Sequence, residues 1–379
     1  MIRIKSENII LKDRLFDGFV YFEDGIIKEV TNKDLPFDKE IDAGKDYVSP
    51  GFIDLHTHGG AGFDFINGEE DVIKGSDFHL THGTTSILPT ISAAPFEKMA
   101  KAVIAVDKVM KDKSSKANII GAHLEGPYLS KDQCGAQCTD FITNPKKDEY
   151  ENLVNNYKDA VARWSYAPEN DKDGEFAKFI TENGIVASAG HTNAIYDDMK
   201  VGMENGLNLV THLFSCTSTI TRDKGFRRLG VIETAFLEDD LYVEIIADGK
   251  HLPPELIKLI IKNKGIEKTA LVTDSLSLAG TDAKQGKMVD TEYIIEDGVC
   301  KLLDRSAFAG SIATSDRLVR VIRDEVGFDI VSAVYMMTKV PANILGLKKG
   351  EIKESCDADI IIFDKDINVK KVFVMGSEK

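Results

Sequence analysis

The sequence lacks three features of secreted and membrane proteins. Its cysteines are few, odd in number and scattered along 379 residues, so no disulfide framework is expected. No run approaches the ~18 apolar residues of a membrane span. Met1–Ser6 alternates apolar and charged side chains, unlike a signal peptide. We therefore expect a protein of the reducing cytoplasm.

Positive charge is also in short supply. Lys and Arg total 47 against 62 Asp and Glu, which gives a formal net charge of −15. Nucleic acids and anionic membranes both need a basic face, so neither is expected as the main partner. A small anionic substrate stays possible, because a few local Lys and Arg side chains can hold a phosphate on an acidic protein.

The two ends of the chain have the character of β structure. Short apolar runs bounded by turn residues lie at 8–11, 18–22, 26–30, 358–363 and 369–375. Neither end is long enough to form a stable domain alone. We expect residues 1–50 and 348–379 to combine into one small β-sandwich beside the main domain.

Between the ends, short apolar strands alternate with amphipathic helices. The eight strand candidates span residues 51–55, 84–88, 118–124, 162–166, 185–189, 209–211, 242–246 and 269–273. This alternation favours a parallel sheet, and eight repeats favour an α/β fold of the closed (β/α)8 TIM-barrel type over 51–347. A doubly wound open sheet is the alternative, but no glycine-rich dinucleotide fingerprint supports it.

Histidine is rare, with eight in the chain, so its positions are informative. His56 and His58 follow the first predicted strand as His-Thr-His. Residues two apart in an extended segment face the same way, so both rings can reach one ion. Imidazole nitrogen is a favoured ligand of zinc and similar metals. Taken alone, the motif reads more readily as two polar residues at a strand end.

Further polar residues stand at the ends of the third, fifth, sixth and eighth strands. They are Glu125, His191, His212 and Asp274. Singly, each could be a capping or solvated residue. Together with the two histidines of the first strand they occupy the face on which barrel active sites form. We therefore predict a divalent-metal site made by all six, with zinc as the expected ion. The donors suffice for two ions bridged by a carboxylate, and one tight ion plus one weak ion is equally compatible.

Two longer motifs contain these residues. Residues 49–59, Ser-Pro-Gly-Phe-Ile-Asp-Leu-His-Thr-His-Gly, resemble the opening signature of the amidohydrolase superfamily. Residues 121–128, Gly-Ala-His-Leu-Glu-Gly-Pro-Tyr, resemble the hallmark of the N-acetylglucosamine-6-phosphate deacetylase family. Supporting matches follow in order at 189–192, 211–214, 246–251, 272–274 and 309–311.

The resemblance implies a fold, a reaction and residue roles. The fold is a barrel with a β-sandwich made from both termini. The reaction is hydrolysis of N-acetylglucosamine-6-phosphate to glucosamine-6-phosphate and acetate, in a homodimer. Glu125, His191 and His212 would bind the metal retained in every member. The histidines of the first motif match a second metal position found in a subset, and Asp274 would be the catalytic acid and base.

Departures from the family pattern fall on the substrate side. Many members carry Gly-Ala-His where residues 135–137 are Gly-Ala-Gln, and Asn-Ala-Met where residues 215–217 are Ser-Cys-Thr. Gln137 could still donate a hydrogen bond to the substrate carbonyl, since its amide carries two donors. Ser215 and Cys216 are expected beside the sugar.

Phosphate-binding candidates cluster in the basic segment 221–228. Arg222 aligns, with one residue deleted, to a family arginine that binds phosphate across a dimer interface. Arg227 is a further candidate, because guanidinium forks suit phosphate oxygens. A solvated loop is the alternative for this segment. His251 could orient sugar hydroxyls or phosphate, with a plain loop histidine as its alternative.

Two other functions stay open at this point. The altered substrate motifs are compatible with deacetylation of N-acetylgalactosamine-6-phosphate or of an unphosphorylated amino sugar. The second is a non-catalytic relative that keeps the barrel for assembly. Such relatives usually lose ligands, whereas all six are present here.

Overall fold

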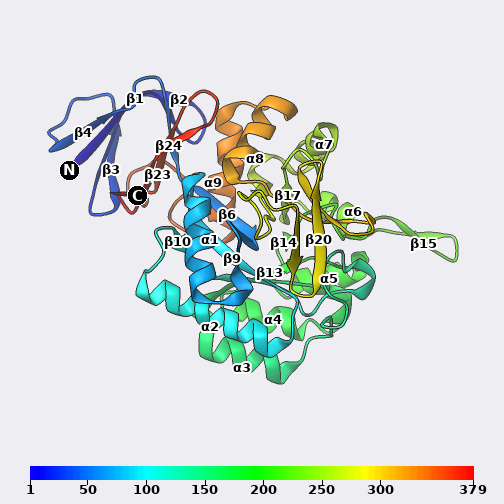
Figure 1. The fold of residues 1–379 in the computed structure, drawn as a ribbon. Helices are drawn as coiled ribbons and strands as arrows, with labels where there is room; N and C mark the ends of the chain where they lie inside the picture. Colours follow the sequence, from blue (N-terminus) through cyan, green and yellow to red (C-terminus); the bar gives the residue numbers. More distant parts are fainter.

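Eight parallel strands form a barrel in the computed structural model, which describes all residues from Met1 to Lys379 (Figure 1). In order around the barrel they are β6 (Phe52–Thr57), β9 (Thr84–Ser92), β11 (Ala122–Glu125), β12 (Val161–Tyr166), β13 (Val186–Ala189), β14 (Leu209–Val210), β17 (Tyr242–Ile246) and β18 (Thr269–Val272). The short β10 (Asn118–Ile119) extends the third of them. The amide of Asp274 donates to the carbonyl of His56 at 2.8 Å, which links the end of β18 to β6.

The predicted barrel is confirmed, and all eight predicted strands are present. Every residue of β6, β9, β11 and β18 is buried. Parallel strands in such a barrel are covered by helices outside and by other side chains inside. This double burial is why they read in the sequence as nearly continuous apolar runs.

Nine α-helices surround the barrel. They are α1 (Glu69–Thr81), α2 (Phe96–Asp112), α3 (Lys147–Tyr157), α4 (Glu175–Glu182), α5 (Tyr196–Glu204), α6 (Val231–Leu237), α7 (Pro254–Lys264), α8 (Ser315–Val321) and α9 (Ile330–Ile344). In α2 the buried residues Met99, Val103, Val106 and Val109 recur every three or four positions, so one face packs on the barrel. None of the helices combines the length and apolar character that crossing a membrane requires.

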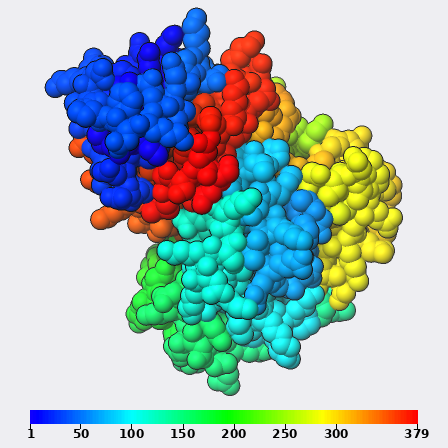
Figure 2. Space-filling view, turned by 60° about the vertical axis from the view of Figure 1, so that its left-hand side comes forward, coloured from blue at the N-terminus to red at the C-terminus, as the bar shows by residue number.

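The two ends of the chain share one sheet. Its strands are β1 (Ile2–Ile10), β2 (Leu15–Glu23), β3 (Ile26–Thr31), β4 (Lys39–Asp42), β5 (Tyr47–Pro50), β23 (Ile360–Phe363), β24 (Val369–Val374) and β25 (Ser377–Glu378). β23 pairs antiparallel with β5, so the C-terminal segment lies beside the N-terminal one (Figure 2). This sheet encloses a core of 13 buried residues of its own. The boundaries at 50/51 and 347/348 stay a prediction.

Three small β elements interrupt the barrel pattern. After β6 comes the pair β7 (Gly59–Gly60) and β8 (Phe63–Asp64). The hairpin β15 (Thr221–Asp223) and β16 (Phe226–Arg228) projects away from the body (Figure 1). A four-stranded antiparallel sheet follows β18 and consists of β19 (Gln285–Met288), β20 (Thr291–Glu296), β21 (Val299–Leu302) and β22 (Phe308–Gly310). This sheet was not predicted from the sequence.

Candidate metal and active site

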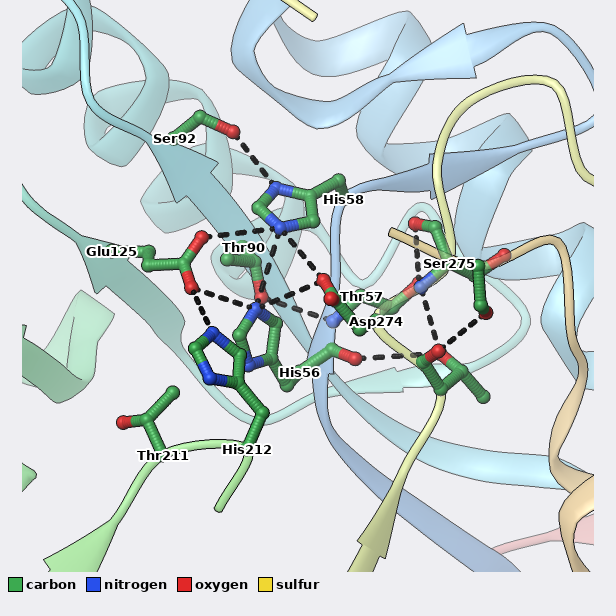
Figure 3. Close-up of polar contacts among 12 residues, drawn as sticks. His56, Thr57, His58, Thr90, Ser92, Glu125, Thr211, His212, Asp274 and Ser275 are labelled. Atoms are coloured by element: carbon green, nitrogen blue, oxygen red, sulfur yellow. Dashed lines mark hydrogen bonds and ion pairs between the residues drawn. The ribbon is translucent and has the colours of Figure 1, made fainter. Parts of the chain in front are cut away.

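Glu125, at the end of β11, is the centre of the polar cluster inside the barrel mouth (Figure 3). Its Oε1 lies 3.0 Å from Nε2 of His212, 3.1 Å from Nε2 of His191 and 3.3 Å from Nε2 of His56. Its Oε2 lies 3.3 Å from Nε2 of His58. Two groups of three donors therefore share one carboxylate.

Asp274 completes the set from the far side. Its Oδ1 lies 3.3 Å from Nε2 of His56 and 3.2 Å from Nε2 of His58. It lies two residues beyond the end of β18 and borders the pocket beside the cluster. The structure thus brings all six predicted site residues together, on the predicted face of the barrel. Their roles as ligands and proton carrier stay predictions.

The histidine rings are held in the orientation that metal ligation needs. His191 Nδ1 lies 2.9 Å from the carbonyl of Gln133, and His212 Nδ1 lies 3.0 Å from the carbonyl of Ser215. A carbonyl only accepts, so each Nδ1 donates, and the Nε2 lone pair faces the cluster when the ring is neutral. Such outer contacts fix the tautomer of ligating histidines.

The spacing of the donors also fits a cation. Two ligands held about 2.0–2.2 Å from one tetrahedral ion lie roughly 3.3–3.6 Å apart. The separations between Glu125 and the four histidines are 3.0–3.3 Å, and the Nε2 atoms of His56 and His58 are 3.3 Å apart. Imidazole and carboxylate are donors that zinc-type ions accept. The residues present therefore fit a divalent cation, with one or two positions that share Glu125.

The charges of the cluster favour a cation as well. Burial alone would raise the pKa of Glu125, but the neighbouring histidines hold it well below its usual range. Burial lowers the pKa values of His56 and His58, but Glu125 and Asp274 outweigh burial and raise them to about 9 and about 10. The two carboxylates thus attract positive charge to this point, whether from protons or from a metal ion.

Three site residues have unusual backbone geometry. The φ angles of His191, His212 and Asp274 are +48°, +26° and +47°. Non-glycine residues rarely adopt this left-handed region, and such strain gathers at functional sites. Each of the three lies two residues beyond the end of its strand, and the turn there directs its side chain into the barrel mouth. The sequence carries no signal for this feature.

A pocket of about 240 Å³ opens beside the cluster. It is lined by site residues and by predicted substrate contacts, among them Gln137, Ser215, Cys216 and His251. Met288 and Phe308 of the four-stranded sheet form a wall of this pocket that was not predicted from the sequence. The motif at 309–311 adjoins Phe308 and was its only sequence signal.

Gln137 and His251 have fixed orientations in this pocket. The amide nitrogen of Gln137 donates to Glu125 Oε2 at 2.6 Å, and its oxygen accepts from the backbone amide of Ala93 at 2.9 Å. One amide proton therefore remains for a substrate. His251 Nδ1 lies 2.9 Å from Asp248 Oδ2, which holds the ring at the pocket wall.

The two predicted phosphate-binding arginines are not in this pocket. Arg222 and Arg227 stand opposite each other on the projecting hairpin, where every residue of both strands is exposed. Binding of phosphate by Arg222 across a dimer interface stays a prediction.

Comparison with known proteins gives consistent matches. The model of the amidohydrolase family matches residues 47–379. The N-acetylglucosamine-6-phosphate deacetylase of Bacillus subtilis is 30% identical, over 99% of this chain and 95% of that protein. The crystal structure of the deacetylase of that name from Pasteurella multocida has a TM-score of 0.92 at 28% identity, over 100% of this chain and 99% of the other. A mutant of the Mycobacterium smegmatis deacetylase in complex with N-acetyl-D-glucosamine-6-phosphate has a TM-score of 0.91 at 25% identity, over 100% and 98%.

Proposed function

Because this chain belongs to the amidohydrolase family, and within it to the N-acetylglucosamine-6-phosphate deacetylases, we propose that it hydrolyses N-acetylglucosamine-6-phosphate to glucosamine-6-phosphate and acetate. It is a hydrolase of carbon–nitrogen bonds. The observation that supports the hydrolytic reaction is the position of Asp274, which borders the pocket with Oδ1 within 3.3 Å of two histidines of the donor cluster. The choice of substrate rests on the similarity to the deacetylases.

Glu125, His191 and His212 would hold one divalent ion, and His56 and His58 would add a second position. Zinc is the proposed ion, with one or two per subunit. A divalent cation bound there supplies Lewis acidity, which polarises a water molecule and the amide carbonyl. Without metal, protonated His56 and His58 lower the pKa of the buried Asp274 against the effect of burial. A bound cation would supply that positive charge in their place and keep Asp274 ionised.

Asp274 then acts twice on one proton. As a carboxylate it accepts a proton from the attacking water. It delivers that proton to the amide nitrogen, which is a poor leaving group until it is protonated. Gln137 donates its remaining amide proton to the carbonyl oxygen of the substrate, where negative charge develops. His251 and Ser215 line the part of the pocket that would receive the sugar.

The phosphate would be bound by a second copy of the chain. Arg222 and Arg227 lie on a hairpin that reaches away from its own pocket, and Phe226 and Ile220 on that arm are 75% and 50% exposed. Apolar side chains on a projecting arm gain by burial against another surface. A homodimer with each hairpin at the partner's pocket accounts for both the position of the arginines and the exposed apolar side chains. The cytoplasm is the proposed location of this dimer.

One alternative substrate class has an observation in its favour. The substituted positions Gln137, Ser215 and Cys216 all line the pocket, so they could select a different N-acyl amino sugar. N-acetylgalactosamine-6-phosphate and unphosphorylated sugars are the candidates. The complete set of six donors gives no support to a non-catalytic assembly role.

Acetate release from a panel of N-acetylhexosamines tests the proposal. Each sugar is supplied with and without a 6-phosphate, with added zinc, and Asp274→Asn serves as the matched control. We expect the highest kcat/KM for N-acetylglucosamine-6-phosphate. Preference for another sugar would support the alternative, and no release from any sugar would overturn the deacetylase proposal.

A further inference from the structure

A buried ion pair lies inside the barrel below the donor cluster. Arg163 comes from β12 and Glu244 from β17, and both side chains are fully buried. Arg163 donates to both carboxylate oxygens of Glu244; its Nη2 lies 2.7 Å from Oε2. Barrel interiors are usually filled by branched apolar residues, and a buried ion pair is weak evidence for stability. This pair therefore calls for a functional explanation.

Arg163 is held in place by the strands that carry the site. Its Nη1 donates to the carbonyl of Leu55 at 3.2 Å, its Nη2 to Thr211 Oγ1 at 2.8 Å and its Nε to Ser188 Oγ at 3.1 Å. Leu55 and Thr211 directly precede His56 and His212 in the sequence. The guanidinium thus hydrogen-bonds to the backbone of the residue before His56 and to the side chain of the residue before His212. The same group also holds the carboxylate of Glu244 in place.

His56 is the one site histidine whose outer nitrogen has no partner. Nδ1 of His191 and of His212 faces a backbone carbonyl, and Nδ1 of His58 lies 2.9 Å from Ser92 Oγ. Nδ1 of His56 is buried and makes no hydrogen bond. Glu244 Oε2 lies 4.0 Å from it. The ring of His123 also packs against His56, with ring centroids 4.6 Å apart.

We propose that, with a metal at the second position, Glu244, fixed by Arg163, closes the 4.0 Å gap and accepts a hydrogen bond from Nδ1–H of His56. This contact would keep the Nε2 lone pair of His56 directed at the second metal position. The inference rests on the proposed function, because it requires a metal at the cluster. It makes Glu244 a positioning residue that acts through His56. Groups that hold ligating histidines in this way typically change metal affinity by about 10–100-fold.

Arg163 explains why the buried carboxylate of Glu244 can act as a hydrogen-bond acceptor for His56. An unpaired buried carboxyl group tends to be protonated, and its O–H could then point at His56 instead of accepting from it. Arg163 supplies the opposite charge and two fixed hydrogen bonds, which leave the remaining acceptor capacity of Oε2 for His56. A glutamine in place of Glu244 could turn its amide group toward Arg163 or His56 and would be a poorer acceptor.

Metal titration of the full-length protein tests the inference. Metal-free wild type and Glu244→Gln are titrated with Co²⁺, followed by visible absorption, and the zinc content after dialysis is measured by elemental analysis. We expect two ions per wild-type chain. In Glu244→Gln we expect one ion to be retained and the affinity for the second to fall about 10–100-fold.

Loss of one partner could destabilise the barrel, so a second variant is needed. The double variant Arg163→Met/Glu244→Leu removes both buried charges and keeps the volume, which buried pairs often tolerate. It lacks the acceptor and should lose the second ion as Glu244→Gln does. The matched control is Lys349→Met/Asp359→Leu, which removes another buried pair, 2.8 Å apart, away from the site. That variant should bind two ions.

The outcomes distinguish a failure of the proposed function from a failure of the role proposed for Glu244. A wild-type chain that binds no metal would overturn the proposed function. A wild type that saturates with one ion, or variants of Glu244 that bind both ions with unchanged affinity, would overturn the role of Glu244 alone. Loss of the second ion in the Lys349 control would also overturn it, since the effect would then follow from general destabilisation.

Discussion

The metal-facing floor of the pocket and its substrate-facing rim are built in different ways. The floor consists of buried residues at or near the ends of barrel strands: His56, His58, Glu125, His191, His212 and Asp274. Three of its four histidines make an outer hydrogen bond that fixes the imidazole ring. The rim is formed by loops near Gln137 and Cys216 and by the sheet that carries Phe308. The barrel of one chain therefore assembles the floor, whereas the rim depends on connections, and the proposed phosphate contacts depend on a second chain.

Metal removal should have the largest effect, and it acts on the floor alone. A chelated, dialysed enzyme should lose measurable acetate release, because nothing else in the cluster supplies Lewis acidity to the water and the carbonyl. Zinc should restore the activity. Substrate binding at the rim can be followed separately by calorimetry with the metal-free protein. Full turnover without any bound metal would contradict the proposal that the floor residues hold a metal ion that the reaction requires.

Asp274→Asn should have the second-largest effect, with a fall in kcat of about 10²–10⁴-fold and little change in KM. Asparagine keeps the shape but can neither accept the proton from water nor return it to the amide nitrogen. Steady-state kinetics give the two constants, and elemental analysis checks that the metal content is kept. Lost metal would reassign Asp274 from proton carrier to essential ligand.

The same contrast describes what could be predicted from the sequence. The eight strands were found because strands buried on both faces read as apolar runs, and the six donors were found because each stands at or near the end of such a run. The ring-fixing contact of Ser92 and the Arg163–Glu244 pair could not be found, because they join strands that are distant in sequence. The left-handed backbone of His212 leaves no mark on residue type.

The rim was harder to predict for a related reason. The four-stranded sheet over 285–310 contributes four of the six residues of a small buried cluster, and another member, Ala136, comes from a distant loop. Its polarity pattern alone does not reveal that contact. Phosphate binding by the arginine-bearing segment stays a prediction, because Arg222 and Arg227 lie on the exposed hairpin and outside the pocket of their own chain.

Arg222→Ala should have a smaller effect, confined to the rim. KM for the phosphorylated sugar should rise about 10–100-fold with kcat nearly unchanged, since a charge-assisted hydrogen bond to phosphate would be lost. Activity on the unphosphorylated sugar should not change. Lys224→Ala, at the tip of the same hairpin, is the matched control. Equal losses on both sugars would contradict a role of Arg222 in phosphate binding. The same measurement with Arg227→Ala would show which of the two arginines contributes more.

Gln137→Ala should have the smallest effect, because this residue touches both halves of the pocket without carrying protons. It donates to Glu125 and faces the pocket with its second amide proton, so its loss should lower kcat about tenfold, as expected for one hydrogen bond to a charged group. Gln133→Ala on the same loop is the control, because its side chain binds only the exposed Asn193. A loss as large as that of Asp274→Asn would show that Gln137 belongs to the floor of the site, and the comparison between the two halves would have to be redrawn with Glu125 and Gln137 as one unit.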